Sequence, residues 1–452
     1  MKDLYSRTNV RSEILFLFTL LFLSSCTSDN DYYQTVPVSS ILEARILELY
    51  GSKDELILPS ETDYSNIPSD PNNPITQAKV ELGKFLFHET GLAKNPNMEI
   101  GTDMYSCASC HHAAAGFQAG TKQGIGEGGI GFGIKGEGRV KNPLYLEEDI
   151  DLQPIRTPSA LNVAYQDVML WNGQFGGTGT NAGTEDNWTI DTPKEANNFG
   201  FQGVETQVIA GLGVHRLVID EDEIINSPYK NMFDLAFPND APENRYSKIN
   251  ASLAIAAFER TLLPNQSPFQ EWLKGNENAM SEQSLNGANV FFNQGKCFTC
   301  HSGPGLNSMT FHAIGMNDLA GEEINTVVDM ATAKGRGGFT QNPDDDFKFK
   351  TPQLYNLKDV KFYGHGGSFQ TIKDVIEYKN NGIAENNLVP ADKLSPNFTG
   401  LELTDVQINN LVSFLEIALY DNNLNRFVPD TLPTGNCFPN ADSDSAADLG
   451  CD

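Results

Sequence analysis

The stretch Cys107-Ala108-Ser109-Cys110-His111 recurs 190 residues later as Cys297-Phe298-Thr299-Cys300-His301. Both stretches read C-x-x-C-H, a spacing that suits covalent haem c, because two thiols join the vinyl groups and the adjacent histidine binds the iron. A zinc ribbon would also use two C-x-x-C pairs, but these pairs lie far apart and each has a histidine directly after it. A thioredoxin-like redox pair would need to occur only once. The two motifs therefore predict two covalent haems.

The sequence around the two motifs is also duplicated. Upstream, residues 82–87 and 286–292 each place a glycine before an apolar and aromatic cluster. Downstream, the stretch Thr157-Pro158-Ser159-Ala160-Leu161-Asn162 corresponds to Thr351-Pro352-Gln353-Leu354-Tyr355-Asn356. The same register sets Trp171 opposite His365. This repetition indicates a duplicated module built around each haem motif.

Composition narrows the class of protein. The chain has 452 residues, of which 39% are hydrophobic and 20% charged, as expected for a folded globular protein. Lys+Arg number 31 against Asp+Glu 59, giving a formal net charge of −28, which disfavours nucleic-acid binding and favours basic partners. The longest apolar runs are too short for a membrane-spanning helix.

The N-terminus has the pattern of an export signal. An apolar run at residues 14–23 follows Lys2, Arg7 and Arg11, and it ends in Leu23-Ser24-Ser25-Cys26, which resembles a bacterial lipobox. We therefore expect residues 1–25 to be a lipoprotein signal peptide and Cys26 to be lipidated. The protein would be lipid-anchored in the bacterial cell envelope, facing the periplasm or the cell surface, and would contact the membrane only through this lipid. An ordinary cleaved signal with an incidental cysteine is the alternative.

Over residues 75–425 the chain resembles the bacterial di-haem cytochrome c peroxidase family, which includes the methylamine-utilisation di-haem enzymes. Besides the haem motifs, the resemblance rests on Leu82-Gly83-Lys84-Phe85-Leu86-Phe87, Arg156-Thr157-Pro158-Ser159, Leu170-Trp171-Asn172-Gly173 and Phe349-Lys350-Thr351-Pro352, in that order. It implies a mainly α fold with two cytochrome c-like haem domains, long loops, and haems near the domain interface. Residues 75–275 would form the N-terminal peroxidatic haem domain and residues 276–425 the C-terminal electron-transfer haem domain. Residues 26–74 would be a tether and an N-terminal arm.

The resemblance also implies an activity. The enzyme would reduce hydrogen peroxide to water with electrons from a small c-type cytochrome or a cupredoxin, by transfer from the second haem to the first. His111 and His301 would be the proximal iron ligands, and Trp171 would lie between the haems. Two alternatives stay open: a di-haem oxidase that modifies a partner protein through a high-valent iron state, and a di-haem electron carrier. A homodimer is a further expectation.

The distal side of the first haem departs from the family. Peroxidases of this family carry a distal histidine after the first haem motif, but this chain has no histidine from residue 113 to residue 214. We therefore expect the sixth position of the first iron to be open. Glu205-Thr206-Gln207 is retained, whereas the acid/base glutamate expected shortly after it is missing. His215 is the natural substitute, because imidazole titrates near neutral pH, and Arg216 would stabilise developing charge.

The second haem departs as well. Where the family commonly has Pro-Tyr-Met-His, with methionine as sixth ligand, this chain has Phe362-Tyr363-Gly364-His365. Tyr363 is the expected sixth ligand of the second iron, and Met309 and Met316 stay open as alternatives. The family often binds calcium between its haems through an asparagine. Here Arg156 stands at that position, although residues 340–346 keep a loop suited to Ca²⁺, so calcium stays open.

The last two cysteines, Cys437 and Cys451, lie in a polar tail at residues 426–452. Export and the even number of cysteines left over predict a disulfide between them. The chain is therefore expected to end in a disulfide-bonded tail.

Overall fold

The computed structural model of the chain describes residues 37–322, 324 and 326–451. The predicted signal peptide and the predicted lipidation site, Cys26, lie outside these residues. The predicted mainly helical class is confirmed. Strands form only two short antiparallel pairs within the described ranges, β1 (Gly129–Ile130) with β2 (Val140–Lys141) and β3 (Phe311–His312) with β4 (Phe349–Lys350).

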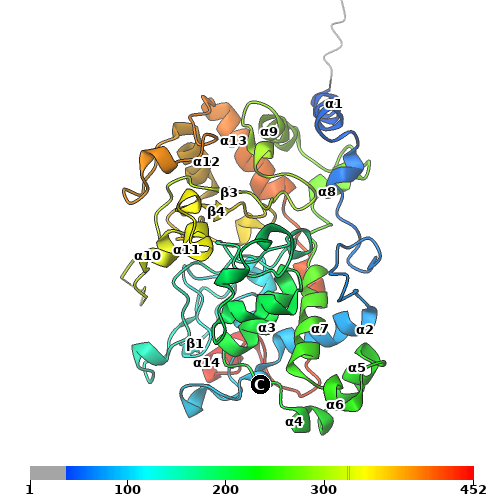
Figure 1. The fold of residues 1–452 in the computed structure, drawn as a ribbon. Coiled ribbons are helices and arrows are strands. Elements are labelled where there is room, and N and C mark those ends of the chain that lie inside the picture. The colour runs from blue at the N-terminus through cyan, green and yellow to red at the C-terminus, as the bar shows by residue number, and fades with distance from the viewer. Residues whose placement is uncertain (1–36, 323, 325, 452) are drawn as a thin grey trace, which may run out of the picture. The chain divides into compact units, whose positions relative to one another are not determined.

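The α-helices are short and are separated by long loops. Their bounds are α1 Val38–Tyr50, α2 Gln77–His88, α3 Gly203–Val214, α4 Glu221–Ile225, α5 Tyr229–Ala236, α6 Pro242–Arg245, α7 Lys248–Arg260, α8 Pro268–Leu273, α9 Glu282–Phe292, α10 Met330–Ala333, α11 Arg336–Thr340, α12 Ile372–Asn381, α13 Asp405–Ser413 and α14 Ser443–Leu449. Figure 1 shows α9, α12 and α13 gathered on one side of the described unit, and α2, α5 and α7 gathered on the other. None of the helices in the described part is long and apolar enough to span a membrane.

Each haem motif is preceded by a helix that crosses a partner helix at a glycine. A Cβ atom on Gly83 of α2 would lie 1.9 Å from the carbonyl oxygen of Ala254 on α7. A Cβ atom on Gly287 of α9 would lie 2.0 Å from the carbonyl oxygen of Asn410 on α13. Only glycine permits so close an approach of two backbones. The glycines that recur in the sequence are therefore the crossing points of two equivalent helix pairs.

Two hydrophobic cores accompany these helix pairs. The first packs α2, α3, α5 and α7 around aromatic side chains such as Phe87, Phe117 and Phe258. The second packs α1, α9, α12 and α13 around Phe269 and Phe291. Burial of large aromatic side chains is the dominant stabilising contribution in cores of this kind. The division into an N-terminal and a C-terminal haem domain stays a prediction, because residues 38–451 cluster as one unit.

The duplicated segments downstream of the haem motifs fold alike. Asn162 and Asn356 both adopt left-handed backbone conformations, with φ of 59° and 55°. The Asn162 N–H donates to Leu262 O at 3.0 Å, and the Asn356 N–H donates to Leu419 O at 3.1 Å. Asparagine tolerates this conformation better than most residues do, which explains its place at both turns.

Candidate functional site

The first C-x-x-C-H motif forms a tight turn that fixes the orientation of His111. The His111 N–H donates to Cys107 O at 3.1 Å, and the ring Nδ1 lies 3.1 Å from Phe117 O. Nδ1 therefore donates to a carbonyl, and the lone pair of Nε2 stays available to a metal. Burial lowers the pKa of His111 to about 4, with a further contribution from the nearby His215, so the imidazole is neutral at pH 7.

The second motif repeats this geometry. The His301 N–H donates to Cys297 O at 2.9 Å, and its ring Nδ1 lies 3.1 Å from Leu306 O and 3.0 Å from Pro352 O. Burial lowers the pKa of His301 to about 4. His301 lines a cavity together with Cys300. The side chains of Trp171, Met316 and Tyr363 reach the same cavity.

The residues of both motifs fit covalent haem c. All four motif cysteines are free thiols, so none is consumed by a disulfide. In each motif a neutral histidine donates its Nδ1 proton to a backbone carbonyl. This is the tautomer in which Nε2 can bind a metal. Cys107, Cys110 and His111 would hold one haem, and Cys297, Cys300 and His301 the other.

The C-terminal end of α3 leads to His215, which lies near enough to His111 to act on it electrostatically. Gln207, Gly211 and His215 succeed one another at four-residue intervals, so they share a helix face. A Cβ atom on Gly211 would lie 3.3 Å from Gln207 Nε2 and 4.0 Å from His215 Cδ2, so both side chains border the space that this glycine leaves. The structure therefore brings two of the predicted distal residues together.

His215 is paired with a carboxylate that the sequence did not reveal. His215 Nδ1 lies 2.7 Å from Asp151 Oδ2, and the Tyr105 hydroxyl donates to His215 O at 2.9 Å. Burial alone would lower the pKa of His215, but the charge and hydrogen bond of Asp151 outweigh it and raise that pKa above its usual value. The His215 side chain is 38% exposed, and no hydrogen bond among the described residues engages its Nε2.

Arg216 is paired in the same way. Its Nε donates to Glu127 Oε2 at 2.6 Å, and the Glu127 side chain is fully buried. The Nη2 of Arg216 is buried and has no hydrogen-bond partner among the described residues. The Nη2 group of Arg216 is therefore unused, although the charge of Arg216 is largely balanced by Glu127.

Both acids come from neighbouring stretches of chain. Glu127 lies in the glycine-rich segment at residues 116–138, and Asp151 lies in the stretch that pairs with it through Ile125 and Leu152. Gly126 N–H donates to Asp151 O at 3.2 Å, and Asp151 N–H donates to Glu127 O at 3.0 Å. A Cβ atom on Gly126 would lie 2.5 Å from Asp151 Oδ2, and one on Gly124 would lie 3.2 Å from Cys110 Sγ. The small residues thus let this segment pass close to the first haem motif while it supports the distal pairs.

Trp171 is held rigidly between the two halves of the chain. Its indole Nε1–H donates to Arg156 O at 2.8 Å, and its carbonyl accepts from the Lys350 N–H at 2.7 Å. The ring lies edge-on to His365, with centroids 6.4 Å apart. The His365 ring in turn stacks on Phe349 at 3.7 Å. Trp171 therefore lines the cavity beside Cys300 and His301 as part of a fixed aromatic group.

Tyr363, the expected sixth ligand, has its hydroxyl in use. The hydroxyl lies 2.9 Å from both Leu357 O and Val360 O, to which its single proton is directed. Burial raises the pKa of Tyr363, so the phenol stays protonated at neutral pH. A tyrosine binds haem iron as phenolate, and this arrangement holds the proton instead. Iron ligation by Tyr363 stays a prediction, one that these contacts do not favour.

The position linked to calcium is occupied by the Arg156 guanidinium. Its Nη1 donates to Thr121 O at 2.8 Å and its Nη2 to Gln118 Oε1 at 3.0 Å, with longer contacts to two further carbonyls. In the loop at residues 340–346, Asp345 pairs with Lys348 and Asp346 with Lys334. The oxygens that a calcium ion would use thus already contact the positively charged side chains of Arg156, Lys334 and Lys348. Calcium binding stays a prediction.

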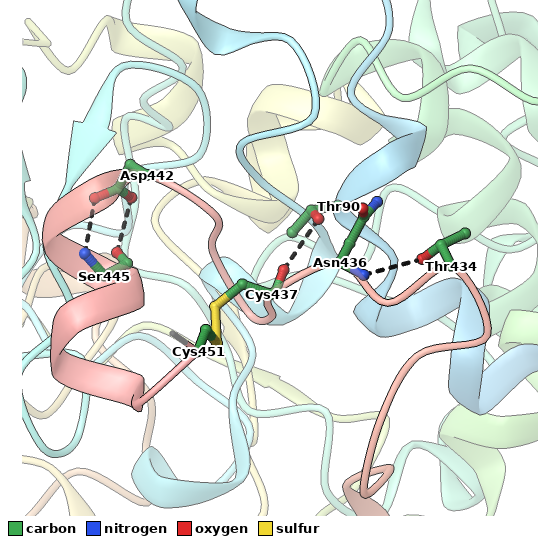
Figure 2. The surroundings of a disulfide bond; sticks show 7 residues. All are labelled: Thr90, Thr434, Asn436, Cys437, Asp442, Ser445 and Cys451. Atoms are coloured by element: carbon green, nitrogen blue, oxygen red, sulfur yellow. Dashed lines mark hydrogen bonds between the residues drawn. A yellow bond between two sulfur atoms is a disulfide. The ribbon is translucent and has the colours of Figure 1, made fainter.

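The C-terminal tail packs against the first haem motif. Cys437 and Cys451 form a disulfide, and Cys437 O accepts a hydrogen bond from Thr90 at 3.1 Å (Figure 2). Two residues of the haem turn, Ser106 and Ser109, donate through their hydroxyls to Pro439 O at 2.9 and 3.1 Å. The tail therefore supports the turn that carries Cys107 and Cys110.

The tail also contacts the glycine-rich segment. Asp442 Oδ1 accepts from Gly131 N at 2.9 Å, and Asp448 Oδ2 accepts from Phe132 N at 2.9 Å. Asp442 also caps α14 by accepting from Ser445 N (Figure 2). The spacing of residues in the tail gives no sign of these contacts, which join parts of the chain more than 300 residues apart.

Comparisons with known proteins agree with this geometry. Residues 77–278 match a family model described as di-haem cytochrome c peroxidase. The chain is 27% identical over 356 residues to the methylamine utilization protein MauG of Methylophilus methylotrophus, covering 78% of this chain and 85% of that protein. It is 24% identical over 365 residues to cytochrome c551 peroxidase of Pseudomonas aeruginosa, covering 79% and 89%.

A solved structure shares the fold. A MauG-like protein associated with microbial copper homeostasis superposes with a TM-score of 0.56 at 23% sequence identity, covering 81% of this chain and 95% of that one. The relatives thus include both peroxidases and MauG-type proteins.

Proposed function

We propose that this member of the di-haem cytochrome c peroxidase family reduces hydrogen peroxide to water with electrons from a small redox protein. The observation that carries the proposal is the His215–Asp151 pair, in which a 2.7 Å contact holds Nδ1 and leaves Nε2 free beside the first haem motif. This is the arrangement that a distal acid/base group needs. Bound at Cys107, Cys110 and His111, haem would supply the iron at which peroxide binds and its O–O bond is broken.

His215 moves the proton that this chemistry requires. With haem bound, Nε2 would accept a proton from one peroxide oxygen and deliver it to the other, which would leave as water. Asp151 keeps Nδ1 protonated and stabilises the imidazolium that forms in between. The complete reaction would consume two electrons and two protons per hydrogen peroxide and yield two waters. Gln207 would hold the peroxide by a hydrogen bond from Nε2, a role supported by its position on the same helix face as His215.

Trp171 serves the electron path between the two sites. Its indole lines the cavity beside Cys300 and His301. Hydrogen bonds from the indole to Arg156 and from Lys350 to the Trp171 carbonyl fix the residue from both sides. A rigid aromatic side chain shortens the gap that an electron must cross. Electrons would enter at the second site from a c-type cytochrome or a cupredoxin, and the acidic net charge of −28 favours a basic donor.

The reaction stoichiometry tests the proposal. The holoprotein is mixed with a reduced small c-type cytochrome and limiting hydrogen peroxide, and both cytochrome oxidation and oxygen release are followed. The proposal predicts two cytochromes oxidised per peroxide and no oxygen release. Oxygen release in place of cytochrome oxidation would indicate disproportionation of peroxide, and the absence of any reaction would exclude the peroxidase.

A second candidate is an oxidase that modifies a partner protein, as the similarity to MauG suggests. The absence of a histidine between residues 113 and 214 favours it, because the first site then has no internal ligand to displace before it reacts. An enzyme of this kind would react rapidly with peroxide yet oxidise small cytochromes slowly. Comparing the two rates under single-turnover conditions separates the candidates.

Anchoring in the cell envelope through a lipid on Cys26 is part of the proposal and rests on the sequence. Metabolic labelling with a radioactive fatty acid should label the wild type and leave a Cys26→Ser variant unlabelled. Labelling of both proteins, or of neither, would contradict a lipid at this cysteine.

A further inference from the structure

The cavity behind the second haem motif contains a thioether at the place where the family resemblance puts the methionine ligand. Gly364 stands at that position, with a φ of +84° that side chains rarely adopt. A Cβ atom on Gly364 would lie 2.9 Å from Met316 Sδ. The space left free by the glycine is therefore filled by a sulfur atom from another segment.

Met316 reaches this place at the end of a chain segment that starts beside the attached cysteines. His312 of β3 has its Nε2 3.5 Å from Cys300 Sγ, and the chain then runs on to Met316. Met316 is 8% exposed and lines the same cavity as Cys300 and His301.

Hydrogen bonds and packing hold residues 312–316 firmly. Ala313 O accepts from Ser395 N at 2.8 Å, and Gly315 O accepts from Asn386 N at 2.9 Å. The Met316 side chain packs against Tyr378 and Phe398. Because both backbone and side chain are constrained, the sulfur is presented in a fixed position, as an iron ligand must be.

Three other candidate ligands in the cavity, Tyr363, His365 and Met169, are engaged elsewhere. The Tyr363 hydroxyl is directed to two backbone carbonyls, and His365 stacks on Phe349 while its Nε2 lies 3.2 Å from Asp318 Oδ1. Met169 has its Cγ within 2.9 Å of a Cβ placed on Gly203, so its side chain packs against α3.

Lys379 also lines the cavity, but it lies at the edge formed by the cysteines. It interacts electrostatically with Cys300 and Cys297, the two points of covalent attachment. Its charge also acts on His301, so Lys379 lies near the whole second motif.

From these contacts we propose that Met316 is the sixth ligand of the second haem iron, bound through Sδ on the face opposite His301. This inference rests on haem being attached at Cys297, Cys300 and His301, which is part of the proposed function. Methionine–histidine ligation makes a c-type haem low-spin and raises its reduction potential. The second haem would then be the site of electron entry, with the ligand supplied by a segment 48 residues away from the usual position.

The test compares three holoprotein variants. Met316→Leu removes the sulfur and nearly conserves volume, so folding should be retained. Met309→Leu is the matched control, because this methionine belongs to the same segment but does not line the cavity. Tyr363→Phe tests the competing ligand. Mass spectrometry first establishes how many haems each variant carries, and then redox titration and near-infrared magnetic circular dichroism follow the second haem.

The inference predicts that Met316→Leu alone loses the charge-transfer band of methionine-ligated ferric haem, turns the second haem high-spin and lowers its reduction potential. Met309→Leu and Tyr363→Phe should match the wild type. Retention of the band in Met316→Leu, or its absence from a wild type that carries two haems, would overturn the inference. If the peroxidase proposal fails instead, the wild type will keep the methionine-ligation band but will not oxidise cytochrome with peroxide.

Discussion

The contact between Asp151 and His215 is the most informative one to perturb. An Asp151→Asn substitution keeps the shape and a hydrogen-bond acceptor at 2.7 Å from His215 Nδ1 but removes the negative charge. If Nε2 takes up a proton during peroxide cleavage, the resulting imidazolium loses its counter-charge. The substitution should therefore slow peroxide reduction without dismantling the site.

The size of the effect follows from the exposure of the two groups. Two unit charges about 4 Å apart attract by about 4 kcal/mol at an effective dielectric constant of about 20. The Asp151 side chain is 6% exposed but that of His215 is 38% exposed, so solvent screening lowers the value towards the range of exposed pairs. A loss of about 1.4 kcal/mol, or roughly tenfold in kcat/KM for peroxide, is the resulting expectation. Complete removal of the base in His215→Ala should cost roughly 10²- to 10⁴-fold.

The pH profile provides a second readout with a defined sign. The neutral imidazole is the competent base, so activity falls as the pH drops through the pKa of His215. Asp151 raises that pKa, and removing its charge should lower it. The acid limb of kcat/KM should therefore move to lower pH in Asp151→Asn.

The assay is steady-state peroxide reduction between acid and neutral pH with a reduced small c-type cytochrome as donor. Asp149→Asn is the control, since Asp149 contacts Asn97 only through its backbone carbonyl, at 3.2 Å, among the described contacts. If Asp151→Asn matches Asp149→Asn in rate and pH profile, and His215→Ala stays within about threefold of wild type, then His215 is not the distal base.

Three further predictions concern the framework. Glu205→Gln should lower the free energy of unfolding by about 3–5 kcal/mol, because it leaves the charge of the fully buried Arg260 unpaired. Denaturant titrations measure this loss, and a loss below about 1 kcal/mol would contradict the prediction. Trp171→Phe should slow electron transfer from the second haem to the first in stopped-flow absorption measurements, and an unchanged rate would remove Trp171 from the path. Replacing Cys437 and Cys451 together by serine should weaken the docking of the tail by roughly 3 kcal/mol. Amide exchange should then become faster around residues 106–110, and unaltered exchange there would refute the docking.

Much of the framework could be predicted from the sequence because it depends on short-range spacing. The two C-x-x-C-H motifs specify the attached cysteines and the adjacent histidine within one turn. Gly83 and Gly287 stand out because each precedes an apolar cluster, and both prove to be helix crossings. The register of the repeat set Trp171 opposite His365, and the two rings are near neighbours in the structure.

The partners of the distal residues could not be predicted, since they come from loops without periodicity. Asp151 lies 64 residues from His215, and Glu127 lies 89 residues from Arg216. Nothing in their local sequence distinguishes these two acids from the other acidic residues of the chain. Their positions depend on how closely the glycine-rich segment approaches the chain beside it, which is a tertiary property.

The second site shows the same limit. Local spacing singles out Tyr363 beside the missing methionine, but the proton of its hydroxyl is directed to Leu357 O and Val360 O. Met316 lies well upstream in sequence and meets Gly364 only through the folding of the intervening loops. Sequence spacing identifies the residues that are proposed to attach the haem, whereas a candidate ligand such as Met316 is found only through long-range packing.

The most direct test of the account is electron paramagnetic resonance of the ferric holoprotein before and after one equivalent of hydrogen peroxide. The account predicts a high-spin signal from a first haem with an open face toward His215 and a low-spin signal from the second haem. It further predicts that the high-spin signal disappears when peroxide is added. Two low-spin signals that remain unchanged after peroxide would contradict a peroxide-reducing first site.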